Sequence, residues 1–264
     1  MLENKKEFKL ISKKNPKPLL PNTLTILGVC LGLSSIKFAL DTNYAMSIIA
    51  IAIAAILDTL DGRVARLVKG TSKVGKELDS LTDVISFGVA PGFIMYFWTL
   101  NELGKVGWVL VLIYTVCCAL RLARFNITAI DENETWKINF FEGVPSPAAA
   151  GLVLLPLILN LSGLIKLENY ITLSFLSILI TSVLMVSKIP TYSLKRILMP
   201  RNSTIFLLLG IGIYVSLLIF YTFQTLFFTG IVYLLLLPVS FLHYRNKNKK
   251  IFISSNQEDD EDVL

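Results

Sequence analysis

Long apolar runs are the feature that most restricts what this chain can fold into. Eight of them follow one another, at residues 24–40, 45–57, 84–100, 106–120, 148–161, 171–186, 205–220 and 226–242. A membrane-spanning helix needs roughly 20 mostly apolar residues, and hydrocarbon offers no water to bond a free backbone group. The runs are also too long for barrel strands. The sequence therefore predicts an all-α fold, a polytopic membrane helical bundle of about eight transmembrane helices.

The composition agrees with a membrane protein. Charged residues make up only 17% of the chain, against about 25% in soluble domains, and the mean hydropathy is +0.65. Two of the apolar runs reach the length of a membrane-spanning helix only if adjoining polar residues are included in the helix. The second run extends through the charged residues 58–66, and the third begins near Gly75, so we expect two charged helix ends at one membrane face.

The distribution of charge predicts the orientation of the bundle. With eight helices, the basic segments 1–20, 63–76, 121–137, 188–201 and 245–250 all lie on one side, and only Lys37, Lys105 and Lys166 lie at or beyond the other. By the positive-inside rule, the basic side and both termini are cytoplasmic. We therefore expect a multi-pass protein of the cell (inner) membrane.

A net charge of +6 is a feature that nucleic-acid-binding proteins also show. The basic residues flank apolar runs, however, and do not interleave with aromatic residues. Membrane lipids with anionic headgroups are the partners that this pattern favours, and no nucleic acid is expected.

Four aspartates stand at helical spacing beside the second and third runs. Asp58 and Asp61 are three residues apart, and Asp79 and Asp83 are four apart, so each pair shares one face of its helix. The short loop at residues 67–74 makes the two helices antiparallel neighbours. We therefore expect all four carboxylates to meet in one gap at the membrane surface.

Four like charges in a partly dry gap repel one another unless cations neutralise them, and oxygen ligands favour a hard ion such as Mg²⁺ or Mn²⁺. The alternative is a solvated helix end that happens to carry acids. Ionisable residues at membrane depth are costly, which favours a functional site. Paired metals typically activate an attacking oxygen and stabilise a leaving phosphate, so phosphoryl chemistry is the natural prediction.

The same stretch carries a resemblance to a known family. It reads DTLDGRVAR from Asp58 to Arg66, followed after eight residues by Gly75 and then by Asp79 and Asp83. This pattern resembles the signature of the CDP-alcohol phosphatidyltransferases at every position. The resemblance implies a homodimer of membrane-embedded bundles, with two divalent metals and a nucleotide held between the helices.

The resemblance also implies roles for individual residues. Asp58, Asp61 and Asp79 would be metal ligands, and Asp83 would lie near the second metal and act as the general base. The residues expected to border the CDP group are Gly62, Ala65, Arg66, Gly75, Asn22 and Thr25. Small side chains at Gly62 and Ala65 leave room for a nucleotide, and Arg66 adds positive charge near phosphate. The division that follows is a basic cytoplasmic arm (1–20), the catalytic helical core (21–200), a C-terminal transmembrane helix pair (201–244) and a cytoplasmic disordered tail (245–264).

Three further stretches bear on the acceptor alcohol: SFGVAPG at residues 86–92, RLARFN at 121–126 and GVPSPAAA at 143–150. With PNTLT at 21–25, they resemble the bacterial and archaeal membrane-embedded phosphatidylserine synthases, whereas the last two helices match only in hydropathy. The resemblance implies transfer of a phosphatidyl group from CDP-diacylglycerol to L-serine, giving phosphatidylserine and CMP.

Serine carries a carboxylate that needs a cation near the metal site. Arg121 and Arg124, three residues apart at one helix end, are the candidates, with Asn126 and Ser146 as possible hydrogen-bonding partners. Alternatively, the arginines reach lipid phosphates at the interface, and Asn126 and Ser146 serve as helix caps.

Other functions stay open on the sequence. Relatives in the same superfamily make phosphatidylglycerophosphate, phosphatidylinositol phosphate or an archaeal ether lipid (archaetidylserine). A cation carrier or channel is the alternative outside enzymes, but the carboxylates cluster at one face and do not line a path through the other runs.

Overall fold

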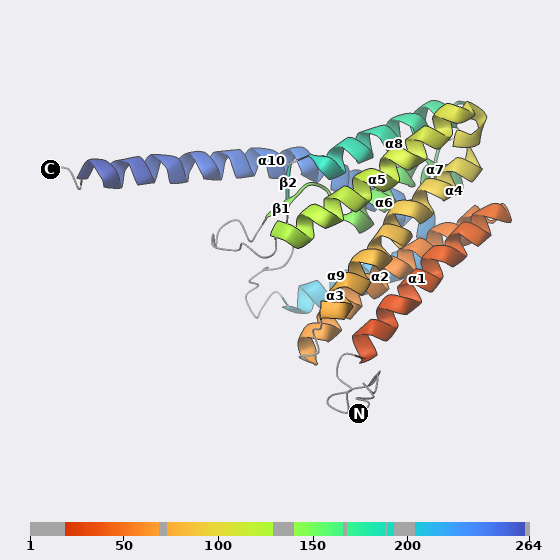
Figure 1. Ribbon diagram of the computed structural model, residues 1–264, viewed down its shortest axis with the longest axis horizontal. Coiled ribbons are helices and arrows are strands. Elements are labelled where there is room, and N and C mark those ends of the chain that lie inside the picture. Colours follow the sequence, from red (N-terminus) through yellow and green to blue (C-terminus); the bar gives the residue numbers. More distant parts are fainter. Residues whose placement is uncertain are drawn as a thin grey trace, which may run out of the picture.

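The computed structural model describes residues 19–68, 73–128, 140–165, 168–187, 189–192 and 204–261. These residues form helices apart from turns and one pair of short strands (Figure 1). The predicted basic arm lies outside the described residues except for its last two positions. The predicted all-α class therefore holds for nearly the whole of the described chain.

The first half of the fold is an up-and-down set of helices. α1 (Leu19–Leu40) and α2 (Tyr44–Leu67) form a hairpin, and Asn43 caps α2 by accepting a hydrogen bond from the Met46 amide. α3 (Lys73–Asp83) then continues through a π-helical turn, η1 (Val84–Val89), into α4 (Ala90–Trp98). A π turn inside a helix re-aims the side chains on either side of it and is frequent at functional sites. Here it follows Asp83 directly.

The second half adds the short turn η2 (Leu100–Leu103), α5 (Lys105–Thr128), α6 (Ser146–Val153), α7 (Leu155–Ser162), α8 (Tyr170–Val186), α9 (Thr204–Phe220) and α10 (Thr222–Glu261). The predicted run at 148–161 is broken into α6 and α7 at Leu154, because Pro156 removes a backbone donor there. Two strands that the sequence did not predict, β1 (Phe140–Glu142) and β2 (Pro190–Tyr192), pair antiparallel. They join the segments before α6 and after α8.

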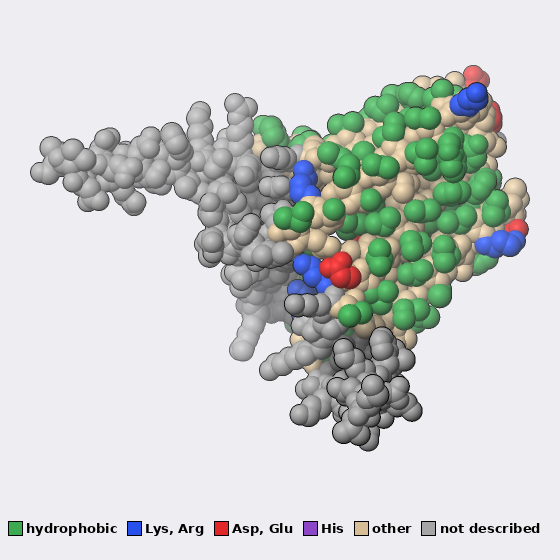
Figure 2. All heavy atoms as spheres, in the orientation of Figure 1, with side chains coloured by type: hydrophobic (Ala, Val, Ile, Leu, Met, Phe, Trp, Pro, Cys, Tyr) green, Lys and Arg blue, Asp and Glu red, His purple; other side chains and the backbone are tan. Residues whose placement is uncertain are grey.

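Five helical segments are long and apolar enough to cross a membrane: Leu20–Leu40, Tyr44–Leu67, Val74–Trp98, Lys105–Ile127 and Thr222–Leu242. α8 and α9 are apolar but shorter, and α6 with α7 is interrupted. On the face drawn in Figure 2, hydrophobic side chains cover the body of the bundle and charged ones gather toward its ends. These features suggest a multi-pass membrane protein.

Close helix packing fixes the chain around η1. Gly32 of α1 lies against Ser86, where an added Cβ would be 2.9 Å from the Ser86 Cα, so a larger residue would push α1 away. The Ser86 hydroxyl donates to the Gly28 carbonyl (3.2 Å), and the buried Tyr114 hydroxyl of α5 donates to the Phe87 carbonyl (2.7 Å). α1 and α5 thus hold the turn that follows Asp83 from two directions.

The last helix differs from the prediction. Residues 245–264 are predicted to be a disordered tail, whereas α10 keeps a helical backbone to Glu261 and extends away from the bundle (Figure 1). Extending an existing helix adds one hydrogen bond for each residue ordered, so a long apolar helix readily continues into a polar segment. The four-part division of the chain itself stays a prediction.

Candidate active site

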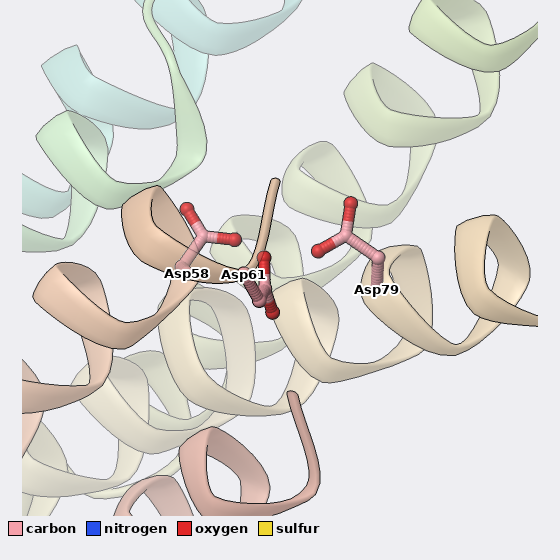
Figure 3. Close-up of side chains that lie close together, drawn as sticks. All are labelled: Asp58, Asp61 and Asp79. Atoms are coloured by element: carbon pink, nitrogen blue, oxygen red, sulfur yellow. The ribbon is translucent and has the colours of Figure 1, made fainter. Parts of the chain in front are cut away.

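Three aspartates from two helices come together at the ends of α2 and α3. Asp58 and Asp61 project from α2 and Asp79 from α3, and each offers an oxygen such that all three atoms lie within 4.8 Å of one another (Figure 3). Helical spacing puts the first two on one face of α2. Three carboxylates this close form a ligand set suited to a hard divalent cation.

Asp61 is the most buried of the three, with 5% of its surface exposed. Its Oδ2 accepts a hydrogen bond from the Thr25 hydroxyl of α1 (2.7 Å), and Thr25 is itself buried. Thr25 was expected beside the nucleotide. That place stays a prediction, and the structure adds that Thr25 orients an aspartate, a contact between residues 36 apart that no sequence spacing reveals.

Asp83 lies one turn beyond Asp79, close enough to Asp58 for the two carboxyl groups to interact. Its Oδ2 accepts a hydrogen bond from the Ser146 hydroxyl (3.1 Å), and Ser146 Oγ in turn accepts one from Arg121 Nη1 (3.0 Å). Ser146 and Arg121 are both buried, at 1% and 8% exposure. A chain of hydrogen bonds therefore runs from α5 through the first residue of α6 to the end of α3.

Several polar atoms of this site are buried and have no hydrogen-bond partner within the described part of the chain: Asp79 Oδ1, Asp83 Oδ1 and Arg121 Nε. A buried polar atom without a partner costs free energy, so such atoms normally have one. Two unpaired carboxylate oxygens, one on the clustered Asp79 and one on the adjoining Asp83, fit a bound cation. The unpaired Nε fits an anionic or polar ligand.

The residues expected to border CDP lie on α1, α2 and α3. Gly62, Ala65 and Arg66 occupy the end of α2, and an added Cβ at Gly62 would meet no atom within 4 Å. Arg66 is exposed, and its Nε donates to the Gly62 carbonyl (3.1 Å). Gly75 on α3 is half-buried. Asn22, likewise half-buried, lies near the start of α1.

The structure brings together only two of the four residues expected to bind the acceptor. Arg121 and Ser146 lie with Asp83, as described above. Arg124 instead donates to the carbonyls of Val186 (3.0 Å) and Ser187 (3.2 Å) at the end of α8, the usual position for a cation at a helix C-terminus.

Asn126 donates to the Ser80 hydroxyl (2.9 Å), tying α5 to α3. Tyr233 of α10, to which the sequence gave no role, interacts electrostatically with Arg121. A lone tyrosine in an apolar run carries no spacing signal that could have revealed this proximity.

Comparison with known proteins agrees with this arrangement of residues. Residues 18–190 match the family model described as CDP-alcohol phosphatidyltransferase. The chain therefore belongs to the CDP-alcohol phosphatidyltransferase family. The match spans α1 to β2 and so includes every aspartate of the site, but not α9 or α10.

Several similar proteins bear one name, CDP-diacylglycerol–serine O-phosphatidyltransferase. A Mycobacterium leprae protein is 42% identical over 187 residues, covering 70% of this chain and 61% of that protein. A Helicobacter pylori protein is 42% identical over 184 residues, 69% of this chain and 76% of that protein. A Bacillus subtilis protein is 36% identical over 130 residues, 49% of this chain and 70% of that protein. The chain thus spans less than two-thirds of the mycobacterial protein's length.

Proposed function

We propose that this protein transfers the phosphatidyl group of CDP-diacylglycerol to L-serine, giving phosphatidylserine and CMP. The observation that carries the proposal is the Arg121–Ser146–Asp83 chain of hydrogen bonds beside the three clustered aspartates. It combines a proton acceptor with a fixed positive charge. The name shared by the similar proteins supports the same reaction.

Asp58, Asp61 and Asp79 would hold divalent cations, with Asp83 adjoining them. We propose two ions per site, Mg²⁺ or Mn²⁺, because the donor set is oxygen only. Bound there, the ions would offset the charge of the diphosphate and of the departing CMP. Thr25 orients Asp61, so the ligand set is partly arranged before a cation binds.

Asp83 is the proposed general base. The serine hydroxyl oxygen attacks the phosphorus of the phosphatidyl group, the bond from that phosphorus to the CMP oxygen breaks with its electron pair, and the hydroxyl proton passes to Asp83. Ser146 donates to Oδ2 of Asp83, which leaves the unpaired Oδ1 to take the proton. A base must lie within hydrogen-bonding reach of that proton, and Oδ1 has no competing partner within the described residues.

The charge at the site favours serine over a phosphorylated acceptor. Arg121 is the arginine beside Asp83, whereas Arg124 is bonded to the end of α8. One guanidinium suits one carboxylate, and a phosphate calls for a denser basic pocket. This argument disfavours glycerol 3-phosphate and an inositol phosphate, the acceptors of the related synthases.

We further infer that all eight apolar segments span the inner membrane, including the shorter α8 and α9 and the interrupted α6–α7. Both termini and the site then face the cytoplasm, and the protein acts as a homodimer. Single cysteines at Lys73 and Asn248 of a cysteine-free variant test the topology. Reagents that do not cross the membrane should label both only from the cytoplasmic side, and labelling of either from outside contradicts the eight-helix arrangement.

The reaction is tested with purified protein, CDP-diacylglycerol and a panel of labelled alcohols. Serine should give a labelled lipid and CMP in equal amounts. Formation of product from glycerol 3-phosphate or an inositol phosphate but not from serine would disprove the acceptor and leave the family assignment intact. A parallel arm with a CDP-activated ether lipid shows whether the donor must be a diacyl lipid.

A further inference from the structure

α10 lies outside the part of the chain that matches the family, yet one of its side chains, Tyr233, has an unpartnered hydroxyl on the Arg121 side of the bundle. The Tyr233 hydroxyl is buried and has no hydrogen-bond partner within the described residues, and the same is true of Arg121 Nε. Tyr233 and Arg121 lie near enough for the charge of one to affect the ionisation of the other. Two buried donors without acceptors in the same region of the bundle suggest a ligand that would accept from both.

Packing of α10 against α7 explains how Tyr233 comes to lie there. The Gln224 side chain donates to the Ser162 carbonyl (3.1 Å), and Gly230 packs against the Leu155 side chain. Leu237, four residues beyond Tyr233, is 8% exposed and belongs to the core. Residues three and four apart share a helix face, so Tyr233 lies on the face that α10 turns toward the bundle.

The geometry of the guanidinium limits what the ligand can be. Arg121 Nη1 already donates to Ser146. The Nε edge of an arginine can bind the two oxygens of a carboxylate in a planar fork, and a phenol hydroxyl can add a further donor to the same group. Ser146 bonds Asp83 on the other side, so an anion held here lies next to the proposed base.

We propose that Tyr233 completes, with Arg121, the subsite that binds the anionic group of the acceptor, which is the carboxylate if the acceptor is serine. α10 then serves recognition of the acceptor as well as anchorage in the membrane. This inference rests on the proposed function for the identity of the acceptor. It deepens that function by assigning a specificity residue outside the family match.

The test is Tyr233→Phe, which removes the hydroxyl and keeps the ring that packs against the core. Because one hydrogen bond to a charged group is lost, the KM for serine should rise about tenfold. The kcat and the KM for CDP-diacylglycerol should stay within about twofold, since the hydroxyl would bind the carboxylate equally in the ground state and the transition state. Tyr214→Phe is the matched control, because its hydroxyl bonds Thr229 within the α9–α10 pair, and it should leave all three constants unchanged.

An unchanged serine KM in Tyr233→Phe would overturn the inference. So would an equal rise in the KM for both substrates, or a similar change in Tyr214→Phe, because each indicates a general loss of structure. The assay on the wild-type protein judges the proposed function separately. If that protein uses another acceptor in place of serine, the same comparison is made with that acceptor: a raised KM upholds anion binding by Tyr233, and an unchanged KM refutes it.

Discussion

The end of the bundle formed by α2 and α3 differs from the C-terminal pair, α9 and α10, in what its side chains contact. Asp61, at the end of α2, is 5% exposed and bonded to Thr25. α9 presents apolar side chains that are mostly exposed, such as Leu208 at 64%. The spacing of the aspartates along the sequence is enough to predict a metal site in the first region. A role for the second region depends on where single side chains such as Tyr233 are placed by helix packing.

Removing a carboxylate from the α2–α3 end should have the largest effect. Asp61→Ala or Asp79→Ala should lower kcat by more than about a thousandfold. Each of these carboxylates would hold the cations whose charge offsets that of the diphosphate. The folded protein should persist, since loss of one of several crowded carboxylates relieves repulsion. Activity and membrane insertion are measured together.

Asp41→Asn is the matched control for these variants. Asp41 is an exposed aspartate that pairs with Lys37 in the turn after α1, and its loss should leave kcat unchanged. A chelator should likewise abolish turnover by the wild-type protein, and added Mg²⁺ or Mn²⁺ should restore it. Full turnover in excess chelator would refute the metal site.

Asp83→Asn, at the same end of the bundle, should have the next largest effect on kcat. The variant keeps the shape of the side chain and loses the proton acceptor, so kcat should fall by on the order of 10²–10⁴-fold. Ser146→Ala should lower kcat less, because the carboxylate remains. If Ser146→Ala proved as damaging as Asp83→Asn, the serine would be more than a support for the base.

The two arginines of α5 can be compared most directly, because the sequence predicts the same role, acceptor binding, for both. Arg121→Ala should raise the KM for serine about tenfold or more, for the loss of a charge-assisted bond of about 1.5–3 kcal/mol. Arg124→Ala should leave that KM unchanged and lower thermal stability, since it loses bonds to the end of α8. A raised KM for serine in Arg124→Ala would show that Arg124 also takes part in binding the acceptor.

The smallest effect should come from the apolar surface of α9. Leu208→Ala should change the free energy of unfolding in detergent by less than about 0.5 kcal/mol, as is usual for exposed positions. Ile94→Ala, at a core position with 0% exposure, should cost about 2–5 kcal/mol. A large loss from Leu208→Ala would show that another surface, such as a second copy of the chain, covers α9.

Local patterns in the sequence determined the features that depend on nearest neighbours along a helix. Apolar runs indicated helices because hydrocarbon leaves the backbone no other partner, and each run is helical in the structure. The spacing of Asp58 and Asp61, and their nearness to Asp79, could be expected because a short connection keeps α2 and α3 together.

Tertiary structure alone decided which residues meet across long separations. Arg121 and Arg124 are three residues apart on one helix, yet one bonds Ser146 and the other the end of α8. The start of α6 and the end of α8 meet α5 at different residues, and no pattern along the chain records where they do so. The β1–β2 pairing and the Thr25–Asp61 bond arise likewise from contacts between distant segments. Helical periodicity describes the face of one helix, and only packing determines which other helix that face meets.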